Sequence, residues 1–185
     1  MSECLDEELV HKYLLGDEKS LEILIQRYLK PIYNFVYRYA GGMANAEDLT
    51  QEVFVKVWKN IKKFDRKRSF KTWIFRIARN TSYDYLRKKK NIPLSYFEDL
   101  EGNNILIDSL EDPAPLPSEL FDQSNIAQKI NTALDKLSLN YRLVISLRHN
   151  DHFKFREIAE SLNESIDTVK SRYRRGLIEL RKFLE

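Results

Sequence analysis

The stretch FREIAESLNESIDTVKSRYRR, residues 155–175, decides how the C-terminal part of the chain folds. Its first part places apolar or small side chains at positions i, i+3, i+4 and i+7, the spacing of one helix face: Phe155, Ile158, Ala159 and Leu162. The polar residues 163–165 then break this pattern. A second helical pattern follows, and Ser165 can cap it by accepting a hydrogen bond from a free amide of the first turn. The stretch therefore predicts a helix-turn-helix.

The second helix of this pair carries different side chains on its two faces. Apolar or aromatic residues repeat every three to four positions and are expected to face inward: Ile166, Val169, Tyr173, Leu177 and Leu180. The outer face carries short polar and basic groups: Thr168, Lys170, Ser171, Arg172, Arg174 and Arg175. Arginine pairs with guanine edges and serine or threonine reaches bases or phosphates, so this face suits a DNA major groove. Helix pairs of this kind also occur as packing units in helical bundles.

Helical spacing extends through most of the chain, and neither a hairpin signal nor a sustained alternation of apolar and polar residues appears in the sequence. The sequence therefore predicts an all-α fold. Helices are expected over about 6–15, ending at Gly16, and from 17 onward, with Pro31 denting or interrupting the second. Further helices are expected over 46–61 and 69–89, and again from near Ile126 to the end of the chain.

Charge is segregated along the 185 residues, although the formal total is only +3. Residues 1–91 hold 19 Lys and Arg against 12 Asp and Glu, and residues 123–185 hold 12 against 8. Residues 92–122 hold 8 acidic residues, no basic residue and four of the five prolines. We therefore expect two basic helical domains, 1–91 and 123–185, joined by an acidic flexible linker. Clustered Lys and Arg favour polyanion binding, although charged faces also simply keep helices soluble.

Several kinds of protein are disfavoured by the sequence. No stretch has the roughly 18 consecutive apolar residues that a membrane span needs, and the acidic start does not resemble a secretion signal. The single cysteine, Cys4, cannot form an internal disulfide. We therefore expect a cytoplasmic protein without membrane insertion. We expect no catalytic residue, cofactor or metal.

A nuclease that binds metal through His149, Asp151 and His152 is an alternative. The two histidines are only three residues apart beside an expected helix end, and the sequence contains no other histidine except His11. Neither a glycine-rich phosphate loop nor a nucleophile paired with a base is visible in the sequence. We interpret these histidines as surface or capping residues.

Aromatic and basic residues alternate in the stretch FDRKRSFKTWIFR, residues 64–76. This combination suits single-stranded DNA, because cations follow the backbone while unstacked bases lie against aromatic faces. The candidate residues are Phe64, Arg66, Lys67, Arg68, Phe70, Trp73 and, one or two turns further on, Asn80. The alternative is that the aromatic residues, Phe70 and Trp73 above all, are core residues at helical spacing.

The helix expected over 46–61 has a mixed outer face, on which large aromatics lie among other groups: Asp48, Gln51, Glu52 and Val55 beside Phe54 and Trp58. Such a mixture is typical of a protein–protein contact. The alternative is that Trp58 is buried within its own domain.

Three ordered segments resemble motifs of the extracytoplasmic-function (ECF) sigma factors of the sigma-70 superfamily. Residues 46–58 resemble the polymerase-binding helix of that family, residues 70–80 its melting and minus-ten region, and residues 156–175 its minus-35 helix-turn-helix. The resemblance covers about residues 5–90 and 125–184. It implies a region 2-like bundle and a region 4-like helix-turn-helix domain in a transcription initiation factor that is not an enzyme.

The resemblance also implies a role for each candidate surface. The 46–58 helix would bind core RNA polymerase, the basic loop and Asn80 would hold the melted minus-ten strand, and the outer face of the last helix would read the minus-35 element. Partners would be core RNA polymerase, promoter DNA both double-stranded and melted, and, for many members, an anti-sigma factor. The sequence departs from many members at Arg174-Arg175-Gly176, so base preference cannot be transferred.

A helix-turn-helix regulator that acts without polymerase is the alternative function. It explains the C-terminal helix pair. It does not explain the aromatic and basic loop or the Trp58 helix.

Overall fold

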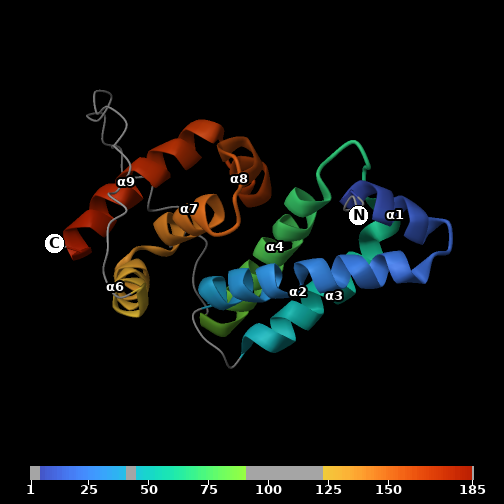
Figure 1. The fold of residues 1–185 in the computed structure, drawn as a ribbon, viewed down its shortest axis with the longest axis horizontal. Helices are drawn as coiled ribbons and strands as arrows, with labels where there is room; N and C mark the ends of the chain where they lie inside the picture. Colours follow the sequence, from blue (N-terminus) through green and yellow to red (C-terminus); the bar gives the residue numbers. More distant parts are fainter. Residues whose placement is uncertain (1–4, 41–44, 91–122, 185) are drawn as a thin grey trace.

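The computed structural model describes residues 5–40, 45–90 and 123–184. In these parts of the chain every regular element is helical, which confirms the all-α prediction (Figure 1). The N-terminal half contains α1 (Asp6–Leu14), α2 (Glu18–Ala40), α3 (Ala46–Asn60), a 3-10 turn (Ile61–Lys63) and α4 (Phe70–Lys90). The C-terminal half contains α6 (Gln123–Lys136), α7 (Leu139–His149), α8 (Phe155–Leu162) and α9 (Ile166–Leu184). The predicted linker, 92–122, lies outside the described residues.

Two helix boundaries in the N-terminal half follow directly from local chemistry. Gly16 leaves α1 with a φ of 105°, a left-handed conformation that costs glycine little. Asp17 then precedes α2, and its side chain accepts a hydrogen bond from the Ser20 hydroxyl at 2.7 Å. The predicted end of the first helix at Gly16 is thus confirmed.

The sequence predicted that Pro31 dents or interrupts the second helix. Interruption was wrong, because α2 runs through Pro31 as one helix. Tyr28, Ile32 and Phe35 on either side of the proline are buried. Proline in a helix interior costs about 3 kcal/mol, and burying each large apolar side chain returns about 1.5–3 kcal/mol. Packing on both sides of Pro31 therefore holds the helix together.

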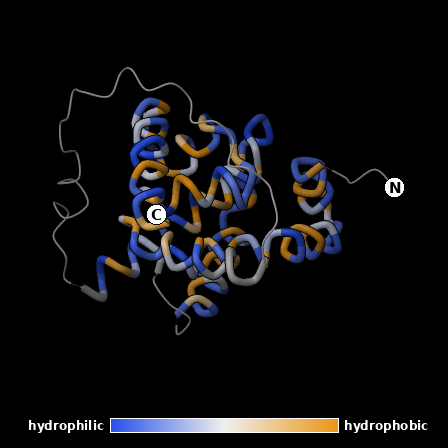
Figure 2. The backbone as a smooth tube through the Cα atoms, turned by 60° about the vertical axis from the view of Figure 1, so that its left-hand side comes forward, coloured by the Kyte–Doolittle hydropathy of each residue, from blue (hydrophilic) through white to orange (hydrophobic). Residues whose placement is uncertain are grey.

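The core of the N-terminal half lies between α2, α3 and α4, with α1 packed across α2 and against the start of α4. Hydrophobic and hydrophilic residues alternate around each helix, so each has one inward stripe (Figure 2). Side chains that are at most 2% exposed fill this core: Val10, Leu24, Ile32, Phe35, Val36, Val53, Val57, Ile61, Phe70, Ile74 and Phe75.

The C-terminal half contains the predicted helix-turn-helix. After α8, Asn163 adopts a left-handed φ of 56°, and the Glu164 N–H donates to the Ala159 carbonyl at 2.9 Å. Ser165 Oγ accepts a hydrogen bond from the Thr168 N–H at 3.0 Å, which confirms the predicted cap. Ala159 and Val169, on the two helices, are both buried. The tight turn therefore fixes α9 relative to α8.

The two halves pack against each other along α4 and α8 (Figure 1). The rings of Phe75 in α4 and Phe153, just before α8, lie with centroids 4.8 Å apart in an edge-to-face arrangement. Both side chains are fully buried. The hydrophobic core thus continues from one half into the other.

Candidate nucleic-acid and protein interfaces

The loop between the 3-10 turn and α4, residues 64–69, is anchored at both ends by aromatic rings. Phe64 and Phe70 are 7% and 1% exposed, and their rings lie 5.6 Å apart, edge to face. Trp73 packs against both rings, with centroids 5.1 and 5.6 Å away. Of the aromatic candidates, Phe64 and Phe70 thus lie in the core, as the alternative interpretation had it, and Trp73 is half-buried. Their packing fixes where the loop leaves the fold.

Backbone hydrogen bonds give the loop its shape. Asp65 Oδ1 accepts from the Lys67 N–H at 3.0 Å, and the Asp65 carbonyl accepts from the Arg68 N–H at 2.9 Å. At the start of α4, Glu7 Oε1 accepts from the Phe70 N–H at 2.9 Å. A carboxylate at this position is also attracted by the positive N-terminal end of the helix dipole, which stabilises the start of the helix. Glu7, in α1, is a positioning residue that the sequence analysis missed.

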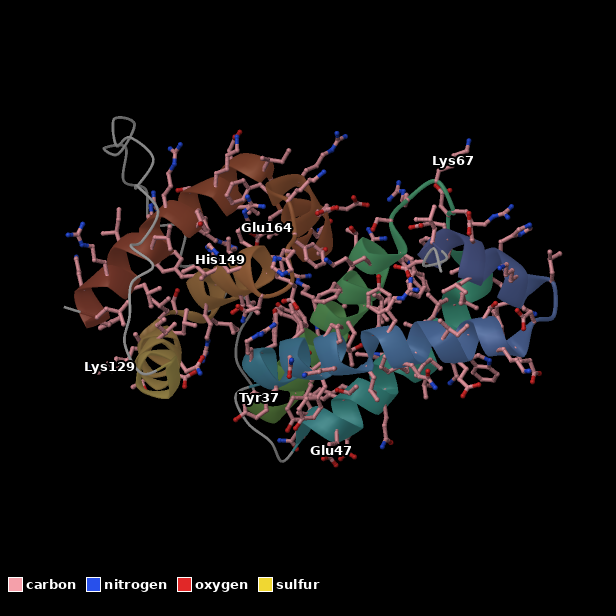
Figure 3. All side chains as sticks on the ribbon, viewed as in Figure 1. Tyr37, Glu47, Lys67, Lys129, His149 and Glu164 are labelled. Carbon is pink, nitrogen blue, oxygen red and sulfur yellow. The ribbon has the colours of Figure 1, made fainter. Side chains whose placement is uncertain are left out.

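The basic side chains at the tip of this loop are exposed. Arg66, Lys67 and Arg68 all lie on the surface, and Lys67 points away from the fold at the far edge of the N-terminal half (Figure 3). Arg66 Nη1 lies 2.6 Å from Nδ1 of His11, which ties the loop to α1. Asn80 is also exposed, and its side-chain oxygen accepts from Arg79 at 3.0 Å. The loop thus presents clustered, exposed cations, and the packed aromatic rings at its two ends hold it in place.

The six side chains predicted for the outer face of α9 differ in how exposed they are. Lys170 and Arg174 are exposed, whereas Thr168, Ser171, Arg172 and Arg175 are partly buried. Tyr173, expected in the core, is half-buried between two rings. It lies edge to face with Phe155 at 5.2 Å and stacks with His149, whose Nε2 lies 2.9 Å from the Tyr173 hydroxyl.

Arg172 is held by an ion pair with Glu164, which lies in the turn between α8 and α9. The two side chains are only 17% and 21% exposed. A guanidinium tied to a carboxylate in this way is less available to base edges than the exposed Lys170 and Arg174. The sequence placed Arg172 on the outer face without this partner, because Glu164 lies in the turn before α9 and helical spacing does not relate the two residues.

Gly176 lies where α9 packs tightly against α7. A Cβ atom built at Gly176 would lie 3.0 Å from Cβ of Tyr141 and 3.0 Å from Cδ1 of Ile145. The glycine is buried. Helix packing therefore favours glycine at position 176.

The outer face of α3 is exposed along its whole length. Asp48, Gln51 and Glu52 are exposed, and beyond them Val55 and Trp58 are 46% and 58% exposed. Trp58 is therefore not a core residue of its own half. Glu47, in the first turn of this helix, lies on the opposite edge of the N-terminal half from Lys67 (Figure 3). The start of the α3 face and the tip of the basic loop thus lie at opposite edges of the N-terminal half.

The residues of the proposed metal cluster do not converge. Asp151 forms an ion pair with Arg38 at 2.9 Å, and His149 contacts Tyr173. Over residues 5–40, 45–90 and 123–184, no three His, Cys, Asp or Glu side chains are grouped to hold a metal ion. In the same ranges no helix is long and apolar enough to cross a membrane.

Fold and surfaces together define a class of protein: an all-helical helix-turn-helix DNA-binding protein with a second helical domain that carries its own basic loop. Family models match both halves of the chain. The model "Sigma-70 region 2" matches residues 24–92, and "Sigma-70, region 4" matches residues 127–180.

Relatives of known function align over nearly the whole chain. The ECF RNA polymerase sigma factor SigW of Bacillus subtilis is 36% identical over 91% of this chain and 91% of its own. The ECF RNA polymerase sigma-E factor of Escherichia coli is 30% identical over 93% of this chain and 91% of its own. Among solved structures, the sigma factor RpoE of Bartonella quintana, crystallised with the anti-sigma factor NepR, is 26% identical with a TM-score of 0.66, covering 90% of this chain and 97% of that one.

The chain belongs to the ECF group of the sigma-70 family of RNA polymerase sigma factors. It directs promoter-specific initiation of transcription, and sigma factors are transcription factors rather than enzymes. The stand-alone regulator is not favoured, because the N-terminal half matches sigma region 2.

Proposed function

We propose that three surfaces of the chain have separate binding roles. The α3 helix binds core RNA polymerase, and the 64–69 loop with Asn80 holds the melted minus-ten strand. The outer face of α9 reads the minus-35 element. The corresponding domains are 1–91 and 123–185, joined by residues 92–122. The observation that carries this proposal is the exposure of Trp58, 58%, beside Val55 on a polar helix face. A large aromatic side chain exposed in this setting is typical of the centre of a protein interface.

The contact residues on α3 are Asp48, Gln51, Glu52, Val55 and Trp58. Their positions follow one stripe of the helix, and all are exposed. The apolar pair would supply the buried centre of the contact, and the three polar residues would surround it and exclude water.

The contacts with the melted strand come mainly from the exposed cations Arg66, Lys67 and Arg68, with Asn80 as a base-reading amide. The buried rings of Phe64 and Phe70 act as positioning residues, since they set the loop's exit from the core. Trp73 is half-buried beside them and offers a partial face for a flipped base. Cations that follow the backbone, with a ring near the base, are what single-stranded DNA requires.

The side chains proposed to contact the minus-35 element fall into an exposed group and a partly buried group. Lys170 and Arg174 are exposed and reach furthest toward DNA, while Thr168, Ser171 and Arg175 are partly buried and contact phosphates or base edges at closer range. Arg172 contributes after its ion pair with Glu164 is exchanged for a phosphate or base.

Core RNA polymerase, promoter DNA and an anti-sigma factor are the proposed partners. Support for the anti-sigma factor comes from the Bartonella quintana relative, which was solved with one. A protein that works with RNA polymerase acts in the bacterial cytoplasm. We propose no catalytic residue, cofactor or metal for this chain.

Gel filtration of the purified chain with bacterial core RNA polymerase tests the proposal. The native chain is expected to elute with the polymerase and Trp58→Ala to elute apart from it, while Leu15→Ala, at an exposed apolar residue outside α3, elutes like the native chain. A native chain that never elutes with core polymerase and never supports a transcript would overturn the proposal.

A further inference from the structure

Two side chains of α1 contact the basic loop at two different places. Glu7 Oε1 accepts a hydrogen bond at 2.9 Å from the N–H of Phe70, the first residue of α4. His11 Nδ1 lies 2.6 Å from Arg66 Nη1 at the tip of the loop, and it accepts there because arginine only donates. Glu7 and His11 are four positions apart, so they lie on one face of α1. One helix face thus holds both the tip and the end of the 64–69 loop.

Phe70 is also held from α2. Its ring lies 5.5 Å from the ring of Tyr28, edge to face, and both side chains are buried. The Tyr28 hydroxyl donates to Asp6 of α1, and Arg27 donates to the other oxygen of the same carboxylate. Burial, followed by the contact with Asp6, raises the pKa of Tyr28, so the hydroxyl keeps its proton and remains a donor. The first turn of α1 therefore holds Phe70 through its amide and, by way of Tyr28, through its ring.

The Phe70 amide is a group that α4 cannot satisfy by itself. The first N–H groups of a helix have no acceptor within the helix. Ser69, at the end of the loop, accepts from the Thr72 N–H at 3.3 Å, whereas the Phe70 N–H bonds to Glu7. Phe70 is 1% exposed, and a buried N–H without an acceptor is costly. Loss of the Glu7 carboxylate would therefore favour other paths of the chain into α4.

A loop that binds DNA gains affinity when it is ordered beforehand. Ordering a mobile segment costs conformational entropy at the moment of binding. The cations of this loop, Arg66, Lys67 and Arg68, are exposed, whereas Phe64 and Phe70 on either side are buried. The arrangement of the cations therefore depends on how the loop is fixed at its ends and at its tip.

We propose that α1 is the positioning helix for the melted minus-ten strand. Glu7 fixes the end of the loop at Phe70, and His11 directs Arg66, so that the loop cations take up their strand-binding arrangement before the DNA arrives. Both residues act through the loop. The Glu7 contact has the larger effect, because it reaches a buried residue, whereas His11 and Arg66 are exposed. This role rests on the proposed minus-ten function of the loop, whereas the contacts of α1 with the loop do not.

Hydrogen exchange in the full chain, read by mass spectrometry on peptides that cover residues 64–72, tests the hold on the loop. Glu7→Ala should raise exchange in these peptides about tenfold, because the Phe70 amide loses a charged acceptor. Glu7→Gln keeps a side-chain oxygen that accepts, so it should raise exchange only about threefold. Glu18→Ala removes an exposed carboxylate from the first turn of α2 and should leave exchange unchanged.

Single-strand binding by the chain in its complex with core polymerase tests the function. The probe is the strand that the native complex selects from a pool of randomised single-stranded DNA. Glu7→Ala should weaken binding to this probe about tenfold, and Glu7→Gln about threefold. Glu18→Ala removes the same charge and reports any general gain in affinity for DNA. Binding to core polymerase should be the same in all four proteins, and a residue that only stabilised the fold would leave strand affinity unchanged.

A double-mutant cycle tests the contact at the loop tip. His11→Ala should weaken strand binding about two- to threefold in the native chain, and it should have no further effect in an Arg66→Ala chain. Equal effects of His11→Ala in both chains would overturn the role of His11. Because this cycle changes only exposed side chains, it decides the matter even if Glu7→Ala loses helix content by circular dichroism.

The results of these experiments separate the role of α1 from the function of the loop. Native exchange and native strand affinity in a folded Glu7→Ala chain would overturn the proposal. Faster exchange without weaker strand binding would make α1 a purely structural helix and overturn it as well. A native complex that binds polymerase and protects the loop, but selects no strand, would instead contradict the proposed minus-ten function.

Discussion

Arg172 in α9 is ion-paired with Glu164, the residue just before the serine that caps the same helix. The α9 helix thus carries two kinds of basic residue. Arg172 is held by a carboxylate of the turn before the helix, whereas others, such as Lys170 and Arg174, are exposed. Stability and DNA binding are therefore expected to depend on different arginines of one helix face.

Arg172→Ala is expected to lower the free energy of unfolding by about 1–3 kcal/mol, because it leaves the largely buried Glu164 carboxylate without its partner. Arg174→Ala should change that free energy by no more than about 0.5 kcal/mol, since its side chain is exposed. Urea unfolding of both variants measures the difference. Equal effects on stability would contradict the structural role of the Glu164 pair.

Trp58→Ala is expected to weaken binding to core polymerase by about 2 kcal/mol or more, roughly thirtyfold, as truncation of an interface tryptophan does. The free energy of unfolding should barely change, because Trp58 is 58% exposed. Val57→Ala, at the buried neighbouring position, should instead lower stability by about 2 kcal/mol. A titration of labelled polymerase, with parallel unfolding curves, checks both. A Trp58→Ala chain that binds normally would remove α3 from the interface.

Arg66→Ala with Lys67→Ala is expected to lessen the salt dependence of binding to a single-stranded minus-ten oligonucleotide. Each lost phosphate contact should reduce the slope of log K against log salt by about 0.7. Lys19→Ala, exposed at the start of α2, should leave the slope unchanged. Measurements in the polymerase complex over a range of salt concentrations test this. Identical slopes for all three proteins would argue against loop contacts with the backbone.

Gly176→Ala should destabilise the chain by about 1 kcal/mol, although alanine is the better helix former. The new methyl group would lie 3.0 Å from Tyr141 Cβ, an atom fixed to the α7 backbone. Overpacking costs about 1–3 kcal/mol, against about 1 kcal/mol gained in helix propensity. Thermal unfolding decides the sign, and a raised melting temperature would mean that α7 and α9 separate easily.

His149 is expected to make stability fall on acidification. Its pKa is lowered, first by burial and then by the nearby charges of Arg148 and His152. The unfolded chain therefore takes up the proton more readily, so this contribution is complete above pH 6.5 and is lost as the pH falls through the lowered value. Between pH 7.5 and 5.5 the native chain should lose more stability than His149→Gln. Parallel losses in the two proteins would contradict the lowered pKa of His149.

Helices, the turn and the Ser165 cap were predictable because they depend on local spacing and local hydrogen bonds. The burial of Phe64 and Phe70 was open from sequence, since an aromatic residue at helical spacing fits a core first but a DNA surface as well. Continuity of α2 through Pro31 was not predictable, because it depends on packing around Tyr28, Ile32 and Phe35.

Contacts between distant residues could not be predicted from one sequence. Arg38 and Asp151 are 113 positions apart, and Phe70 and Glu7 are 63 apart. No local pattern in the sequence links the two members of either pair. The candidate surfaces were therefore found by pattern, whereas the residues that position them were found only in three dimensions.

Run-off transcription with bacterial core RNA polymerase on a pool of randomised promoters tests the central claim most directly. The account predicts that the native chain enriches transcripts from promoters with two spaced elements. Lys170→Ala with Arg174→Ala should remove the upstream preference while polymerase binding is retained. Transcripts without any enriched upstream element, or an unchanged upstream preference in that variant, would contradict the account.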